Sequence, residues 1–492
     1  MRKYIIPFFL VLLSWGYTNA QQVLNLDDCR RMAIENNKDL KIKKEQVAVA
    51  ESMKKIALTQ HLPNISGKGA YFHNSNNISL LSEDKFAPVG KVMEDGSFGF
   101  DQTHVNNEWT MINGQPVPLD ANEQPFDPKL HPEKIKWKGY AYLSKKEFTI
   151  DNKNIFIAAI SLVQPIYMGG KIRELNKIAG FAKDLALAEQ EGEMSDILYS
   201  VDAAYWQVVS VSNKLKLASQ FKELIQKLNK DVDDMVTEGV ATKSDMLKVR
   251  VKLNEADLSV IKAQNGLNLS KMLLCQLTGM PMDSQFMLAD ENIKVEADPA
   301  AEVPEINEAY KNRAEIKQLE QAINMSNANI KLKLSNFLPN IGLTANYMWT
   351  NPDLYNGFKK KFKGAWNVGV AVSVPIFHWG ERIHTRNAAK AEHKIIEYKL
   401  ENAKEKIELQ VRQSTYKINE ARKRMAMTDE NVASATENLR MAEEGYKEGV
   451  ITLSNLMEAQ VSWQSAYSER IDAAVDVKLS DVYLKKSSGN LR

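Results

Sequence analysis

The side chains best suited to binding a metal ion are seven histidines and two cysteines, and their spacing does not bring them together. The closest set of histidines is His378, His384 and His393. Their spacings of 6 and 9 residues differ from the spacing of 4 that places two ligands on one face of a helix, and no cysteine lies near them. We therefore expect no metal ion and no cofactor.

Motifs of catalytic chemistry are also missing from the sequence. It holds no nucleophile elbow, no phosphate-binding loop and no pair of acidic residues at catalytic spacing. We expect that the protein is not an enzyme, so its function has to follow from the elements that the chain builds.

The first 20 residues have the pattern of a secretory signal peptide. Arg2 and Lys3 precede an apolar run over residues 5–13, and Thr18-Asn19-Ala20 resembles a cleavage site. The exported chain holds only Cys29 and Cys275, which excludes a disulfide framework. We expect two free buried thiols, with a single disulfide between Cys29 and Cys275 as the alternative.

The charge balance and hydropathy limit the partners of the chain. Its 64 basic residues are interspersed with 62 acidic ones, which argues against a nucleic-acid-binding surface. After the signal, no window approaches the roughly 18–20 apolar residues that a membrane-spanning helix needs. A role in a membrane would therefore have to use strands or partner proteins.

The sequence repeats itself at two different offsets. Leu62-Pro63-Asn64-Ile65 recurs 276 residues later, at residues 338–341. Pro165-Ile166-Tyr167 recurs 210 residues later, at residues 375–377, with a phenylalanine in place of the tyrosine, and Glu238-Gly239-Val240 recurs at 448–450 with the same offset. The constant offset of 210 predicts one structural element that occurs twice, and the difference of 66 residues predicts an insertion in the first half.

Each half is expected to contain a long antiparallel helical hairpin. The stretch from Gly170 to about Val236 is free of proline, and its apolar residues follow a heptad seam typical of coiled-coil packing. The seam residues are Ile197, Val201, Ala204, Val208, Val211, Leu215 and Ala218, continued by Phe221, Ile225, Leu228, Val232 and Met235, and in the second half Ile407, Val411, Ser414, Ile418, Ala421 and Met425. Gly239 and Gly449 are suited to end these helices, and Thr242 and Thr452 to cap the returning ones. Two further helices are expected over about 26–60 and 304–336.

Between these helices the apolar period changes to two. In the second half, Ile341, Leu343, Ala345, Tyr347 and Trp349 alternate with small or polar residues, and so do Trp366, Val368, Val370, Val372 and Val374. The first half repeats this more weakly, with Ile65, Gly67, Gly69 and Tyr71, and with Phe156, Ala158, Ile160 and Leu162. Strands of about ten residues with one apolar face suit a membrane β-barrel with a wet lumen.

Four such strands cannot close a barrel, and open sheet edges are not tolerated in hydrocarbon, so several copies of the chain would have to join. Residues 74–150 contain the 66-residue excess and are rich in Asn, Asp, Lys and Pro. We interpret them as a long extracellular loop.

The order of these landmarks, repeated twice after a signal peptide, resembles the TolC-like outer membrane efflux protein family. The resemblance implies a mainly α-helical protein whose hairpins form a periplasmic tunnel, and a homotrimer that contributes four strands per chain to a twelve-stranded barrel in outer membrane lipid. It divides the chain as follows: signal peptide 1–20, first repeat 21–279 with a hairpin tip near 239, linker 280–303, second repeat 304–486 with a strand pair at 339–377 and a tip near 449, and a tail over 487–492.

The resemblance also assigns candidate functional residues at the hairpin tips. A pore constriction matches Asn455 and Glu458, of which only Glu458 is acidic, so one ring of three carboxylates is expected in the trimer. Tip closure matches Asp245 and Tyr446, while the position of an arginine in the family's polar latch holds Ile451. Contact with a periplasmic adaptor matches Gly239, Val240 and Ala241, and Gly449, Val450 and Ile451.

The function that follows is an exit duct that passes small molecules from an inner-membrane pump and a periplasmic adaptor to the exterior. A duct for exported proteins in a one-step (type I) secretion system is the first alternative. A periplasmic coiled-coil adaptor or scaffold without a pore is the second. Two hairpins and two amphipathic strand pairs favour a channel over the adaptor.

Overall fold

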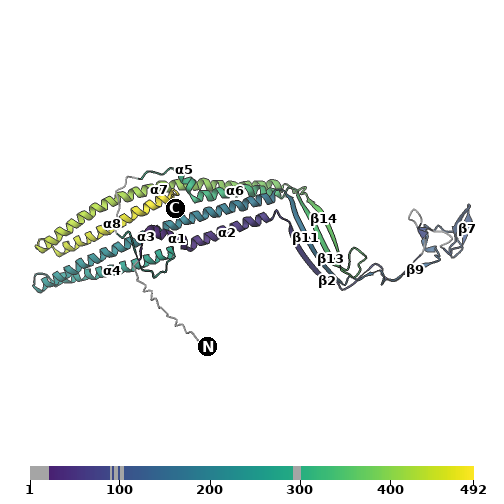
Figure 1. Cartoon of the computed structure of the whole chain (residues 1–492), viewed down its shortest axis with the longest axis horizontal. Helices are drawn as coiled ribbons and strands as arrows, with labels where there is room; N and C mark the ends of the chain where they lie inside the picture. The colour runs from purple at the N-terminus through teal and green to yellow at the C-terminus, as the bar shows by residue number, and fades with distance from the viewer. Residues whose placement is uncertain (1–21, 89–90, 93–97, 100–104, 292–300, 492) are drawn as a thin grey trace, which may run out of the picture. The chain divides into compact units, whose positions relative to one another are not determined.

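The computed structural model describes residues 22–88, 91–92, 98–99, 105–291 and 301–491 (Figure 1). The predicted signal peptide at 1–20, residues 292–300 of the predicted linker and residue 492 of the tail lie outside this range. The chain forms two compact units. The first combines Met1–Gln60, Gly169–Leu338 and Pro375–Arg492, and the second combines His61–Met168 and Pro339–Val374.

Four long helices dominate the first unit and form two antiparallel hairpins (Figure 1). They are α3 Lys171–Thr237, α4 Lys243–Thr278, α7 Glu381–Lys447 and α8 Leu453–Ser487. α3 and α7 have 67 residues each, and their bounds differ by the 210 residues of the sequence offset. At about 1.5 Å per residue, each extends on the order of 100 Å.

The predicted heptad seams are largely buried in the structure. In α3, nine of the twelve seam residues are fully buried, and Val211, Leu215 and Met235 are half-buried. In α7, all six predicted seam residues are buried, Ser414 among them. The polar Ser414 is tolerated there because its hydroxyl bonds to the Ser487 hydroxyl, 2.7 Å away, and to the Val411 carbonyl oxygen.

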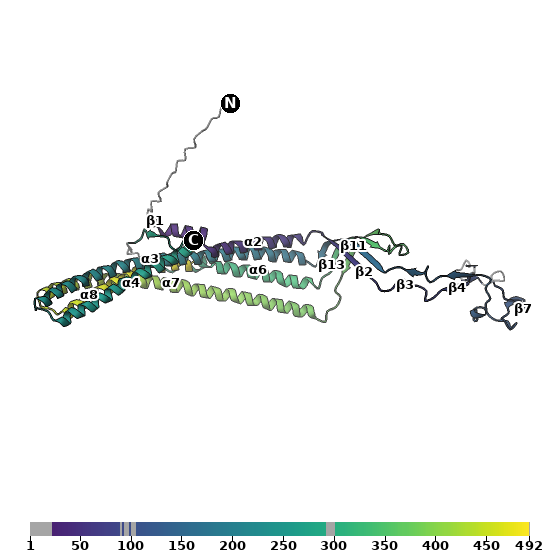
Figure 2. The same cartoon turned by 90° about the horizontal axis from the view of Figure 1, so that it is seen from below.

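The two shorter helices expected in this unit are each broken in two. The first is α1 Leu26–Asn36 followed by α2 Lys38–Thr59, and the second is α5 Ile306–Asn312 followed by α6 Ala314–Ser335 (Figure 1). Figure 2 shows α2 and α6 running alongside α3. Asn37 breaks the first because its side chain accepts from the backbone of Asp39 and so starts a new helix. Arg313 has an extended backbone at the second break.

A hydrophobic core joins α1, α3 and α4 around Tyr205. The core is closed by the parallel pairing of β1 Gln22–Leu24 with β12 Phe286–Leu288. Tyr205 is fully buried, and its hydroxyl donates to Asp290 at 2.7 Å. Cys29 and Cys275 belong to the same core as free, fully buried thiols.

A charged pair anchors α1 to α3 at this core. The carboxylate of Asp202 is fully buried and accepts two hydrogen bonds from the Arg30 guanidinium, one of them at 2.7 Å from Nε. Desolvation raises the pKa of Asp202, and the Arg30 hydrogen bonds oppose that rise. Removal of Arg30 would leave a buried carboxylate without its counter-ion and would therefore strongly destabilise the fold.

The second unit is built on a four-stranded antiparallel sheet. Its strands are β2 Asn64–His73, β11 Asn154–Met168, β13 Asn340–Asn351 and β14 Lys363–Ser373, in the order β14-β13-β11-β2. The sheet therefore joins the strand pair of the first half to that of the second through β11 and β13.

The pairing register places the predicted apolar positions of these strands on one face of the sheet, and Val374 lies one residue beyond β14. Tyr347 lies opposite Trp366 on β14 and opposite Ile160 on β11, and Ile160 lies opposite Gly67 on β2. This face is solvent-accessible in the single chain: Trp366 is 73% exposed and Val370 is 62% exposed.

The predicted loop at 74–150 has local structure of its own. Its short antiparallel pairs are β3 Ile78–Ser79 with β10 Thr149–Ile150, β4 Lys85–Pro88 with β9 Tyr140–Leu143, β5 Lys91–Val92 with β6 Phe98–Gly99, and β7 Trp109–Ile112 with β8 Gln115–Pro118, beside the 3-10 helix η1 Pro132–Lys134. The side chain of Asn107 is buried and donates to the carbonyl oxygens of Leu119 and Lys134. Such bonds between distant segments are not visible in composition, which is why the sequence indicated only a loop.

Among the residues that the structure describes, no helix is both long and apolar enough to cross a membrane.

Candidate functional site at the hairpin tips

Both long hairpins end in the same turn. Val240 and Ala241 donate their backbone N–H groups to the Met235 carbonyl oxygen, at 2.8 and 3.2 Å. Val450 and Ile451 do the same to the Gly445 carbonyl oxygen, at the same two distances. This geometry needs a residue with positive φ at the helix end, which Gly239 (φ 80°) and Gly449 (φ 69°) supply.

The returning helices start at threonine caps, as predicted. The Thr242 hydroxyl accepts from the Asp245 backbone N–H at 3.2 Å, and the Thr452 hydroxyl accepts from the Asn455 backbone N–H at 3.3 Å. The hydrogen bond that the Thr242 hydroxyl donates to the Asp245 carboxylate, followed by one from Lys248, lowers the pKa of Asp245. Asp245 therefore acts as a charged cap at the start of α4.

Tyr446 lies between the two hairpins. It is half-buried, and its hydroxyl donates to the Met235 sulfur atom on α3 at 3.7 Å. Desolvation, and next the negative charges of Asp245 and Asp231, raise the pKa of Tyr446. Asp245 and Tyr446 are therefore close enough to interact electrostatically, but the hydrogen bonds of Asp245 go to Thr242 and Lys248.

Ile451 packs into an apolar cluster that joins the two hairpins at this end. A Cβ atom added at Gly445 would lie 3.4 Å from the Ile451 side chain, so Ile451 packs directly against this position of α7. The buried members are Phe221, Ile225, Leu228, Val232, Val249, Ala256, Leu439, Ala442, Leu453, Leu456 and Ala459, with Val236, Met246, Tyr446, Ile451, Met457 and Trp463 packed at their edge. The predicted seam of α3 supplies four of these buried members, Phe221, Ile225, Leu228 and Val232. The members from α4, α7 and α8 were missed because the heptad pattern was traced along α3 and only as far as Met425 of α7.

The other predicted tip residues are accessible. Val240 and Val450 are 74% and 78% exposed, and Gly239 and Gly449 are exposed beside them. Asn455 and Glu458 lie exposed on the first turns of α8, where one chain alone does not enclose them. Both hairpins thus present an exposed valine at the turn, and the second hairpin also presents the acidic Glu458 near the start of α8.

Two of the three histidines of the second half, His378 and His393, have separate local partners. The His393 Nδ1 atom lies 2.7 Å from the Ser326 hydroxyl, and the His378 ring packs edge-on against Phe337. Within the described part of the chain, no group of three or more His, Cys, Asp or Glu residues could hold a metal ion.

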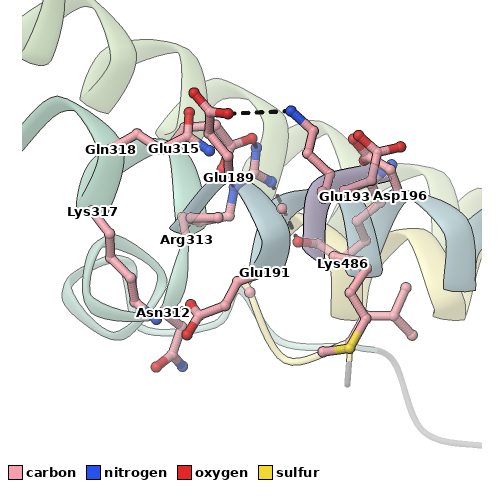
Figure 3. Close-up of a pocket in the computed structure, with 17 residues that line it drawn as sticks. Glu189, Glu191, Glu193, Asp196, Asn312, Arg313, Glu315, Lys317, Gln318 and Lys486 are labelled. Atoms are coloured by element: carbon pink, nitrogen blue, oxygen red, sulfur yellow. Dashed lines mark hydrogen bonds and ion pairs between the residues drawn. The ribbon is translucent and has the colours of Figure 1, made fainter. Parts of the chain in front are cut away.

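A polar hollow of about 660 Å³ lies where α3, α6 and the end of α8 meet (Figure 3). Its charged side chains pair with one another: Glu191 with Lys317, Asp196 with Lys486, and Glu315 with Arg313. Arg313 also donates to the Lys486 and Ser487 carbonyl oxygens. The hollow is best explained as a junction that ties α6 to α3 and α8, since each of its lysines and its arginine already has an acidic partner.

Solved structures share this architecture of long paired hairpins joined to a four-stranded sheet. The CmeC outer membrane channel of Campylobacter jejuni superimposes with a TM-score of 0.70 at 17% identity, over 100% of this chain and 93% of its own. The open state of the MtrE outer membrane channel of Neisseria gonorrhoeae has a TM-score of 0.67 at 16% identity, over 95% and 89%. The fold is therefore that of outer membrane channels.

Sequence comparison identifies the family. The profile of the family described as outer membrane efflux protein matches residues 139–280 and 306–490. The chain belongs to the outer membrane efflux protein family. It is similar to outer membrane protein TolC of Escherichia coli, at 22% identity over 361 residues (69% of this chain and 70% of the relative). It is also similar to the alkaline protease secretion protein AprF of Pseudomonas aeruginosa, at 21% over 324 residues (65% and 67%).

Proposed function

We propose that the chain is the outer membrane exit duct of a tripartite efflux system. Three copies form a twelve-stranded barrel in the outer membrane of a Gram-negative bacterium and a helical tunnel in the periplasm. Small toxic molecules enter from an inner-membrane pump and a periplasmic adaptor and leave at the cell surface.

The observation that carries this proposal is the sheet of the second unit. Its apolar residues share one accessible face, which suits contact with lipid. In the described part of the chain, the edge strands β2 and β14 each pair on one side only. Because unpaired backbone groups are not tolerated in hydrocarbon, other copies have to pair with both edges.

The helices support the same oligomer. α4 carries a second heptad series that stays exposed in the single chain, formed by Leu247, Val251, Leu258, Ile261 and Met272. α2 carries another, formed by Ile42, Val49, Met53 and Ile56. Apolar seams of this kind are normally covered by a neighbouring helix, here one from the next copy.

The tips take the roles that the family resemblance implies. Gly239, Val240, Ala241, Gly449, Val450 and Ile451 form the contact with the adaptor, which is consistent with the exposed valines at both turns. Glu458, with Asn455 beside it, forms the constriction, where three carboxylates on the pore axis concentrate cations and repel anions. Tyr446 and Asp245 hold the tip shut, Tyr446 as part of the apolar cluster around Ile451.

A secretion duct for proteins is the second candidate, favoured by the likeness to the alkaline protease secretion protein AprF. The two functions share the same duct and differ in the pump and the adaptor. Membership of the efflux family argues against the third interpretation, an adaptor without a pore.

Surface labelling tests the topology that the proposal requires. Asn113, in the exposed turn between β7 and β8, is replaced by cysteine in a chain whose own thiols are buried. A membrane-impermeant maleimide should label Asn113→Cys on intact cells. The matched variant Glu255→Cys, exposed on α4, should react only after the outer membrane is permeabilised. Protection of Asn113→Cys on intact cells would contradict the channel.

A further inference from the structure

A lysine-rich segment closes the turn between β13 and β14. Lys359, Lys360, Lys361 and Lys363 occupy four of five consecutive positions, and all four are exposed. From residue 352 to residue 363 the only acidic residue is Asp353, which is fully buried. The turn therefore carries an excess of three positive charges at one end of the four-stranded sheet.

Two of these lysines have acidic partners. Lys360 pairs with Asp151, and the Lys363 Nζ atom lies 3.7 Å from the Asp353 carboxylate. Within the part of the chain that the structure describes, Lys359 and Lys361 take part in no ion pair. These two ammonium groups are available to an external anion.

Aromatic rings lie directly beside the lysines. Phe362, between Lys361 and Lys363, is 63% exposed, and its ring centroid is 6.0 Å from that of Phe156. Phe156 in turn packs on Tyr71, at 4.7 Å between centroids, on the apolar face of the sheet. Aromatic side chains at the end of an apolar barrel face mark the level where hydrocarbon meets the polar headgroups.

We propose that Lys359 and Lys361 bind the phosphate groups of anionic lipid in the leaflet that surrounds this end of the sheet. The inference rests on the proposed function, since it requires the sheet to lie in a membrane. Charge complementarity favours an anionic lipid as the ligand, because the segment is basic. The segment also directly follows the aromatic end of the apolar sheet face, which is where the lipid headgroups are expected. Lysines at an anionic membrane surface contribute about fivefold each to affinity.

The test uses the full-length protein in detergent, titrated with lipid A that carries two phosphates and with its dephosphorylated form. Wild type should bind the phosphorylated lipid and gain thermal stability from it, and the dephosphorylated form should have little effect. Lys359→Gln/Lys361→Gln should bind phosphorylated lipid A on the order of 25-fold more weakly. The matched control is Lys227→Gln/Lys230→Gln, which removes two exposed lysines from α3 and should bind like wild type.

Three results would overturn the proposal. The first is equal binding by wild type and the Lys359→Gln/Lys361→Gln variant, and the second is equal competition by inorganic phosphate at the same concentration. The third is unchanged lipid binding with a shift of ion selectivity, which would place these lysines at the pore mouth. Channel conductance of the same preparation separates the two hypotheses. A conducting protein without lipid preference contradicts only this inference. A lipid-binding protein that stays silent even after the tip is loosened by Tyr446→Ala contradicts only the proposed function.

Discussion

Tyr446 of α7 and Met235 of α3 meet across the two hairpins of one chain, with the tyrosine hydroxyl 3.7 Å from the methionine sulfur atom. Sulfur is a weak acceptor, so packing contributes more to this contact than the hydrogen bond. Because Ile451 packs into the same cluster, the tip of this chain is held together mainly by apolar contacts.

Tyr446 should therefore act through its ring. We expect Tyr446→Phe to leave the unfolding free energy nearly unchanged, and Tyr446→Ala to lower it by about 2 kcal/mol, since the ring is only half-buried. Chemical unfolding in detergent measures both. A loss in Tyr446→Phe as large as that in Tyr446→Ala would show that the hydroxyl, rather than the ring, holds the tip.

Ile451 provides a second test of apolar closure. An arginine at this position would place a charge at the edge of the apolar cluster that joins the two hairpins, next to the buried Leu453 and Leu456. We therefore expect Ile451→Arg to destabilise the tip by about 1–2 kcal/mol. Ile451→Leu keeps the apolar volume and should behave like wild type. Proteolysis within the turn at 448–452 reports the opening. Greater protection of Ile451→Arg than of wild type would indicate a polar latch that the substitution restores.

Replacement by alanine should destabilise the protein at a turn glycine and stabilise it at a glycine inside a helix. Gly449 has a φ of 69° and open space around it, so Gly449→Ala should cost about 1 kcal/mol through backbone strain alone. Gly180 lies inside α3, also with open space, and Gly180→Ala should stabilise the protein by up to about 1 kcal/mol. Thermal unfolding of the two variants checks the signs, and equal effects would contradict the assigned turn.

The buried thiols should be inert in the folded protein. Burial raises the pKa of Cys29 to about 12 and also raises the pKa of Cys275. At pH 8 a thiol with a pKa near 12 is ionised in roughly one molecule in ten thousand, and only the thiolate reacts with maleimide. We expect no labelling before unfolding and two labelled cysteines after it. Labelling of the native protein would contradict the burial, and failure to label the unfolded protein would reveal a disulfide.

The same shift gives a dependence of stability on pH. The unfolded chain loses the Cys29 proton near pH 9 while the folded chain keeps it, so stability falls as the pH rises from about 9 toward 12. Unfolding curves of wild type and Cys29→Ala should therefore converge over this range. A difference that stays constant with pH would contradict the raised pKa.

The sequence predicted the elements that obey a strict period. Ile197 to Met235 follow a heptad and are buried or half-buried along α3, and Trp366 to Val372 alternate and share one sheet face. It did not predict the breaks at Asn37 and Arg313, because a single cap residue competes there with an otherwise helical pattern.

The sequence also did not predict the contacts between segments that are distant along the chain. The Arg30–Asp202 pair spans 172 residues, and the contact between Tyr446 and Met235 spans 211. No local sequence pattern could therefore predict either contact. The ring of Glu458 side chains and the division into repeats at 21–279 and 304–486 stay predictions, since they depend on the assembled oligomer and on the family resemblance.

Single-channel conductance in a planar bilayer tests the central claim most directly. The purified protein should give small cation-preferring steps, and Glu458→Gln should weaken that preference while Glu469→Gln, an exposed acid further along α8, leaves it unchanged. Unchanged selectivity in Glu458→Gln would contradict the carboxylate ring. Well-folded protein that stays silent, even after the tip is loosened by Tyr446→Ala, would contradict the channel itself.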